Sequence, residues 1–223
     1  MRALTAAAGL VGIGLLAGCA PDYSAVRDWS VQARETLLPP ASVRPASGLA
    51  IAPAPPAEVT AEGRLGAVRA LQEAAAAWLA VLAYMGDDGL PRGRTNQFGA
   101  LAARVQPFDA EGAAAVDALG ETLATGVRRN WRAPALREAV DRGNAPFQGV
   151  IAALARQTAA LEREARAGDA QAVEARRAAL ALIAEGHALL QERHARLAGG
   201  ETARLLRLQE SELRRLMALG GGG

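Results

Sequence analysis

The sequence contains no lysine, and all 25 of its basic residues are arginine. The chain therefore lacks the phosphate-binding loop that ends in Gly-Lys-Ser/Thr, as well as any lysine for Schiff-base chemistry. None of its five serines lies in a Gly-x-Ser-x-Gly motif. With two histidines and one cysteine, it contains neither His-Glu-x-x-His nor Cys-x-x-Cys. We expect a protein that is not an enzyme and holds no metal or cofactor.

Net charge and aromatic content are also low. The formal net charge is +2, and the first 18 residues contribute Arg2 and no acid, which leaves +1 for the rest. A balance this close to zero gives no electrostatic reason to expect nucleic acid as a partner. A single cysteine excludes internal disulfides. Aromatic residues make up 4% of the chain, so we expect its stability to come from packing of small and aliphatic side chains.

Residues 1–18 have the layout of a secretory signal. Arg2 supplies the positive end, and the following run to Ala17 is apolar or small apart from Thr5. That run is too short to remain in a bilayer as a spanning helix. It ends in Leu16, Ala17, Gly18 and Cys19. This ending resembles the lipobox of bacterial lipoproteins.

The resemblance implies cleavage before Cys19, a lipid on its sulfur and acylation of its new amino end. Three acyl chains anchor a protein stably, whereas one chain does so only marginally. Ala20 follows the cysteine where an aspartate would favour the inner membrane. The resemblance therefore implies an outer-membrane protein facing the periplasm, with the membrane as a partner. The alternative is an ordinary cleaved signal followed by a coincidental cysteine.

Composition divides the chain into four parts. Six of the eleven prolines lie between Pro39 and Pro56, and in polyproline geometry such a tether could reach on the order of 50 Å. We expect a signal peptide (1–18), a lipidated N-terminus with a short helix and a Pro/Ala-rich tether (19–58), a helical bundle (59–198), and a tail helix with a glycine-rich end (199–223).

From residue 59 onward, apolar residues recur every three or four positions, which predicts amphipathic helices and no strand. We expect an all-α, antiparallel up-and-down bundle of about four long helices, with short corner helices and a tail helix. Gly143 should end one short helix, and Asn144 with Pro146 should open the next long one. The expected helices cover residues 23–37, 59–85, 96–105, 109–131, 135–142, 144–168, 170–198 and 201–219.

The two histidines, His187 and His194, are seven positions apart on the fourth long helix. On one continuous helix they would point within about 20° of each other. Such a pair could bind a metal or respond to pH. A Glu-x-x-His motif is absent, because positions 184 and 191 are alanine and glutamine. We therefore favour two partly buried, hydrogen-bonded histidines.

A basic cluster with an embedded aromatic comprises Arg128, Arg129, Trp131 and Arg132. It could receive a phosphate or carboxylate, with Trp131 as a platform. The alternative is that these cations complement the negative end of a helix dipole. We favour the dipole interpretation.

The tail helix carries an apolar arc that predicts contact with a membrane surface, docking or dimerisation with protein, or simple coverage of its own bundle. Of the first two we favour protein. The arc comprises Leu205, Leu206, Leu213, Leu216, Met217 and Leu219.

The leading hypothesis is a membrane-anchored, periplasm-facing lipoprotein. Its bundle would act as a non-enzymatic interaction or structural module with an envelope protein as partner. The alternative is a bundle that binds a small molecule or lipid. Its ligand would lie among Trp78, Phe98, Phe108, Trp131 and Phe147.

Overall fold

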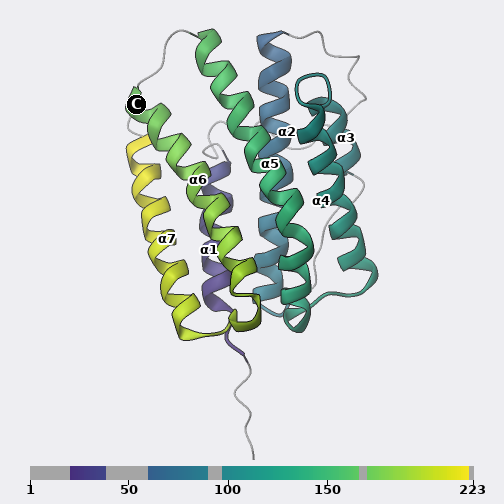
Figure 1. The fold of residues 1–223 in the computed structure, drawn as a ribbon, viewed down its shortest axis with the longest axis vertical. Coiled ribbons are helices and arrows are strands. Elements are labelled where there is room, and N and C mark those ends of the chain that lie inside the picture. Colours follow the sequence, from purple (N-terminus) through teal and green to yellow (C-terminus); the bar gives the residue numbers. More distant parts are fainter. Residues whose placement is uncertain (1–20, 39–59, 90–96, 166–169, 221–223) are drawn as a thin grey trace, which may run out of the picture.

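The computed structural model describes residues 21–38, 60–89, 97–165 and 170–220. These residues form seven α-helices and two 3-10 turns, and none of them is in a strand (Figure 1). The all-α bundle predicted from periodicity is thus confirmed. The elements are α1 (Ser24–Leu37), α2 (Ala61–Gly86), α3 (Gln97–Val105), α4 (Ala110–Arg128), η2 (Ala133–Ala135), α5 (Leu136–Ala165), α6 (Ala170–Glu192), η3 (His194–Arg196) and α7 (Gly200–Gly220).

The lipobox residues and the proline-rich segment lie outside the described residues. Cleavage and lipidation at Cys19 therefore stay predictions.

Five helices form a closed ring, in which α1, α2, α5, α6 and α7 pack in that order and α7 returns to α1. Helices α3 and α4 pack against each other and form a second group with α2 and α5. Helices α2 and α5 therefore belong both to the ring and to this second group. Ring neighbours run antiparallel, except for α7 and α1, which run in the same direction (Figure 1). The short α6–α7 connection explains the antiparallel arrangement of those two helices, because it leaves the chain no room to cross the bundle.

Helix α1 is part of the bundle core. Val26, Trp29 and Ala33 are completely buried in the same cluster as the residues of α2, α5 and α6. The domain division drawn from sequence placed this helix before the tether and outside the bundle. In the structure, residues 39–59 instead connect two helices that pack against each other. An amphipathic pattern predicts that a helix buries one face, but it does not say against which neighbour.

Helix α7 completes the ring. Leu206, Leu213 and Leu216 of the predicted apolar arc are buried against the core. Met217 and Leu219 are about 40% exposed. The tail helix therefore buries half of its apolar arc within its own chain, while Met217, Leu219 and, outside the arc, Leu208 leave apolar surface open.

Helix α5 is a single helix of 30 residues, which corrects the predicted break at Gly143. Gly143 and Pro146 both lie inside it. A Cβ at Gly143 would come 2.0 Å from Cζ2 of Trp78, so this glycine makes room for an indole of α2. The predicted stop signal was wrong because packing against Trp78 outweighs the low helix propensity of glycine, about 1 kcal/mol relative to alanine.

A glycine also makes room for each of the other two tryptophans. A Cβ at Gly186 would lie 2.3 Å from Trp29, and one at Gly126 would lie 2.4 Å from Trp131. All three indoles are at most 2% exposed. Glycine in a helix thus admits a large ring from another helix or, for Trp131, from the turn that follows the same helix. This gives close packing despite the low aromatic content.

Candidate functional site

His187 is the centre of a buried polar network that links α2, α5 and α6. The indole Nε1–H of Trp78 donates to His187 Nε2 at 2.9 Å. Because an indole can only donate, His187 Nε2 must be the acceptor, and the proton of the neutral ring sits on Nδ1. That nitrogen lies 2.9 Å from Oδ1 of Asn144, to which it donates. Phe147 stacks on the imidazole with ring centroids 4.5 Å apart.

The network continues outward through three amides. Asn144 donates from Nδ2 to Gln191 Oε1 at 2.5 Å. Gln148 donates to the backbone carbonyl of Ala184 at 2.8 Å. The polar groups therefore run from the core to half-buried positions between α5 and α6, each with a partner.

Burial keeps His187 uncharged. Desolvation lowers its pKa from 6.5 to about 3. Both ring nitrogens are already engaged, and the side chain is 0% exposed. At neutral pH His187 therefore has no free lone pair to accept a substrate proton, and it acts as a link among three helices.

His194 lies away from this network. Helix α6 ends at Glu192, and His194 begins the 3-10 turn η3. Its side chain is exposed, with Nδ1 2.8 Å from the carbonyl of Gln191. The predicted alignment of His187 with His194 on one helix was wrong because the helix ends between them. Within the described ranges, no group of three or more His, Cys, Asp or Glu side chains could hold a metal ion.

Trp131 is turned into the core and cannot serve as a platform for a ligand. Helix α4 ends in a Schellman motif: Asn130 has φ 51°, and Trp131 N–H donates to the carbonyl of Gly126 at 2.9 Å. This reversal lays the indole over Gly126, where it is 2% exposed.

The arginines of the same cluster stay outside. Arg129 pairs with Glu138 at 2.5 Å, and Arg128 donates to Thr125 Oγ1 at 3.1 Å. Arg132 is exposed. The cluster therefore offers cations at the surface but no aromatic face.

The aromatics of the proposed ligand site pack in the core or against a charged side chain. Trp78 and Phe147 surround His187, and Phe98 and Trp131 pack on glycines of α4. Phe108 lies under Arg64, whose Cζ is 5.5 Å from the ring centroid. Each ring has a packing role that explains its position.

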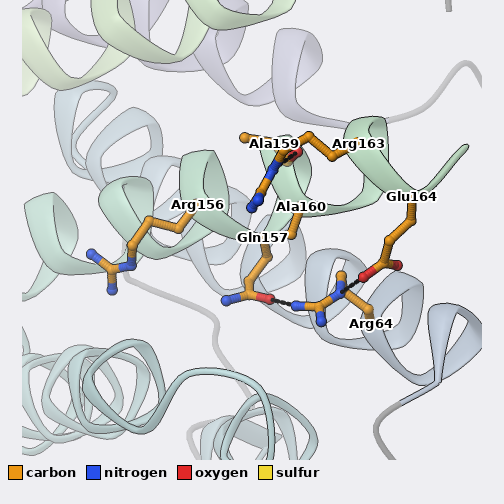
Figure 2. Close-up of a pocket in the computed structure, with 7 residues that line it drawn as sticks. All are labelled: Arg64, Arg156, Gln157, Ala159, Ala160, Arg163 and Glu164. Carbon is orange, nitrogen blue, oxygen red and sulfur yellow. Dashed lines mark hydrogen bonds and ion pairs between the residues drawn. The ribbon is translucent and has the colours of Figure 1, made fainter. Parts of the chain in front are cut away.

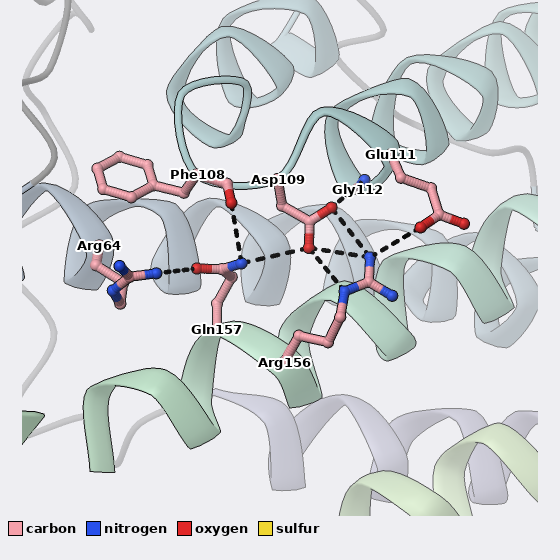
Figure 3. A network of polar contacts seen from close by, with 7 residues as sticks. All are labelled: Arg64, Phe108, Asp109, Glu111, Gly112, Arg156 and Gln157. Carbon is pink, nitrogen blue, oxygen red and sulfur yellow. Dashed lines mark hydrogen bonds and ion pairs between the residues drawn. The ribbon is translucent and has the colours of Figure 1, made fainter. Parts of the chain in front are cut away.

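A second polar network, which the sequence analysis missed, joins the start of α4 to α5 (Figure 3). Asp109 caps α4 by accepting a hydrogen bond from Gly112 N–H at 2.8 Å, as its position before the helix predicts. The same carboxylate accepts two hydrogen bonds from Arg156, each at 3.0 Å. Gln157 donates to Asp109 at 3.3 Å and to the carbonyl of Phe108 at 3.2 Å.

Arg64 connects this network to the start of α2. Its Nη1 donates to Gln157 Oε1 at 2.7 Å, and its Nε pairs with Glu164 at 3.0 Å. The Arg64 side chain is 17% exposed. It therefore ties α2 to α5 across about 100 residues of sequence.

The residues around Arg64 line an open pocket (Figure 2). Gln157 lies between Arg64 and Arg156 in this view. Arg163 donates only to the carbonyl of Ala159 in its own helix, at 3.2 Å, and has no carboxylate partner among the residues described. The pocket thus offers one spare guanidinium beside two neutralised ones. Its lining residues are Arg64, Arg156, Gln157, Ala159, Ala160, Arg163 and Glu164.

Asp109 stays ionised in this setting. Burial works against its charge, but hydrogen bonds from Arg156, Gly112 and Gln157 outweigh that effect and hold the pKa of its carboxyl below the usual value. The same contact raises the pKa of Arg156. The network contains no serine, threonine or cysteine, so it provides charge and hydrogen bonds but no nucleophile.

No family model, no curated protein and no solved structure matches this chain. Among the residues that the structure describes, α2 has the length and composition to cross a membrane. Most of its apolar window is buried in the bundle, as expected for a core helix.

Proposed function

We propose that this protein is a lipid-anchored protein of the bacterial envelope, whose helical bundle acts as a non-enzymatic interaction module. The observation that carries the proposal is the sequence from Leu16 to Cys19, followed five residues later by the start of α1. Trp29 of this helix is completely buried. A lipid on Cys19 would therefore attach directly to the folded body.

Metabolic labelling tests the anchor. An alkyne-bearing fatty acid should enter the full chain expressed in bacteria, and the protein should fractionate with the outer membrane. The Cys19→Ser variant should incorporate no label and should leave the membrane fraction. Equal membrane retention of both proteins would overturn the lipid anchor.

The interaction role rests on the polar clusters, which link helices to one another and present no nucleophile with a free base. A partner must then contact the outer surface. Tyr84 of α2 and Leu208 of α7 are the most exposed large apolar side chains described, at 51% and 57%. They lie on different helices, so each serves as a control for the other.

Crosslinking in cells tests this role. Amine-reactive reagents are unsuitable because the chain has no lysine. A photoreactive amino acid should therefore replace Tyr84 or Leu208, one at a time. A single discrete adduct from one position and none from the other would support a specific protein partner. Identical ladders, or no adduct from either position, would contradict it.

A further inference from the structure

One end of the bundle, which we call the α1-start end, is where the chain enters the fold. Helix α1 begins there beside the end of α2, and the α4–α5 and α6–α7 connections lie at the same end (Figure 1). Arg27 of α1 pairs with Asp87, just beyond α2, at 3.0 Å. Tyr23, immediately before α1, is 7% exposed and belongs to the core. The chain is therefore held in place from Tyr23 onward.

Four residues beyond Cys19 bring the chain to Tyr23, and a fully extended chain advances at most about 3.6 Å per residue. A lipid on Cys19 would thus hold Tyr23 within about 14 Å of the membrane interface. A helix of 26 residues such as α2 is about 39 Å long at about 1.5 Å per residue. The proline-rich segment adds no reach, because it follows α1.

Arginines with and without a carboxylate partner occur throughout the bundle, but those without one gather at the α1-start end. Away from this end, Arg64 pairs with Glu164, and Arg176 and Arg177 pair with Glu162. Arg214 and Arg215 pair with Glu210 and Glu212 on the part of α7 that lies beside α1. Arg69 and Arg163 have no carboxylate partner within the described residues. At the α1-start end, four exposed arginines have no carboxylate partner within the described part of the chain. They are Arg128, Arg132, Arg137 and Arg196.

These four arginines lie on one side of the α1-start end. Three come from the α4–α5 connection and its flanking turns, and Arg196 comes from η3, which packs against α5. The carboxylates of this end that lie near α1 include Asp22, Asp87 and Asp88, and Arg27 pairs with one of them. The α4–α5 side, which we call the arginine corner, also carries Asp141 and Glu138, and Glu138 pairs with both Arg129 and Arg142. Arginines outnumber carboxylates on this side, so it is the basic part of the end.

We propose that the arginine corner contacts the headgroups of anionic phospholipids, so that the bundle stands on the membrane with its α1-start end down. Guanidinium groups bind phosphate oxygens in a forked geometry. Each arginine near an anionic membrane surface strengthens binding to that surface roughly fivefold. The inference rests on the proposed lipid anchor, because the short connection from Cys19 brings this end to the surface.

A site-specific fluorophore tests the orientation. Since Cys19 is the only cysteine, a cysteine introduced elsewhere is the only free thiol of the lipidated protein. Ala195→Cys places it in η3 at the α1-start end, and Ala61→Cys places it in the first turn of α2 at the other end (Figure 1). Both positions are exposed. The lipidated full chain is reconstituted in phosphatidylglycerol-containing vesicles with a headgroup quencher. The label at position 195 should be quenched far more than the label at position 61.

Charge removal tests the lipid contact. In the R128Q/R132Q/R137Q/R196Q variant, quenching at position 195 should fall toward the value in pure phosphatidylcholine vesicles. The matched R69Q/R163Q/R176Q/R177Q variant loses the same charge away from the α1-start end and should keep the original quenching. Equal quenching of the two labels would overturn the orientation. Quenching at position 195 that ignores both lipid charge and the arginine variant would overturn the headgroup contact. A chain that carries no lipid would instead fail to float with the vesicles, which separates failure of the anchor from failure of this inference.

Discussion

The polar groups around His187 and those around Asp109 both tie α5 to its neighbours, but by different chemistry. In the core, His187 is neutral and its partners are an indole and an amide. At the edge, Asp109 and Arg156 are charged, and the Arg156 side chain is 46% exposed. A neutral ring costs less to bury than an unpaired ion, while an ion pair at the surface keeps part of its hydration. The difference predicts that the core network is sensitive to packing and mild acid, and the edge network to charge removal and stronger acid.

The largest loss of stability is expected at Gly143, where the core network needs room for the indole of Trp78. In Gly143→Ala, the new methyl would overlap Trp78 and displace the indole from His187. We expect a loss of about 3 kcal/mol or more in the free energy of unfolding, from overpacking and a broken buried hydrogen bond. Urea unfolding followed by circular dichroism measures it.

Gly99→Ala is the matched control, because a Cβ there meets nothing within 4 Å. Alanine is the better helix former, so this variant should gain about 0.5–1 kcal/mol. Equal destabilisation by both variants would mean that the contact with Trp78 is not what requires glycine at position 143.

Mild acid should weaken the core network next. The pKa of His187 is about 3 in the folded protein and 6.5 ordinarily, so the unfolded chain binds a proton more readily. The stability that follows from a neutral His187 is complete above pH 6.5 and is lost as pH falls toward 3, at about 1.4 kcal/mol per pH unit. His187→Gln, which cannot gain this charge, should flatten the pH dependence of the urea midpoint between those values. An unchanged slope would contradict the assignment.

At the edge, two variants separate the helix cap from the ion pair. Asp109→Asn keeps an oxygen for Gly112 N–H but loses its charge toward Arg156, and we expect a loss of about 1 kcal/mol. Asp109→Ala also removes the cap and should lose about 2 kcal/mol. Since the folded pKa of Asp109 is lowered, the wild-type advantage should persist above its ordinary value of 3.8 and vanish below the folded pKa. Thermal unfolding of the wild type and the two variants is compared at neutral pH and near pH 2. A stability difference between the wild type and Asp109→Asn that persists near pH 2 would argue against the ion pair.

The smallest effect is expected at Glu164, whose side chain is 43% exposed. Glu164→Gln removes the charge that faces Arg64 but leaves the hydrogen bond from Arg64 to Gln157. We expect a change of about 0.5 kcal/mol or less, because solvent screens an exposed pair. Thermal unfolding at about 1 M salt, where the screening length falls to about 3 Å, should abolish the difference. A larger loss of stability would mean that the pair of Arg64 and Glu164 matters as much to the fold as the core network does.

Helix ends were predictable where local chemistry decides them. The cap at Asp109 follows from a side-chain preference that acts within one turn. Helix α2 also ends close to the expected position, but the left-handed residue that ends it is Asp88 and not Gly86. Gly143 misled for the opposite reason: the residue that explains it, Trp78, is 65 positions earlier in the sequence, on another helix. The same holds for Arg64 and Gln157, which are 93 residues apart. Periodicity identified the buried faces, but it contained no information about which faces meet.

The site residues also divide into those whose position follows from the local sequence and those whose position does not. Burial of His187 follows from the apolar face of α6, whereas the fate of His194 depends on where the helix stops. The inward turn of Trp131 required a left-handed Asn130, a conformation that asparagine adopts more readily than most residues. That signal was present in the sequence as Asn130 directly after two arginines at a helix end.

The closed ring also determines the order in which this chain can complete its fold. Gln32 of α1 accepts a hydrogen bond from Arg214 of α7 across 182 residues. Helix α1 therefore has one flank without its neighbour until the last helix is present, so the ring cannot close before the whole chain is available.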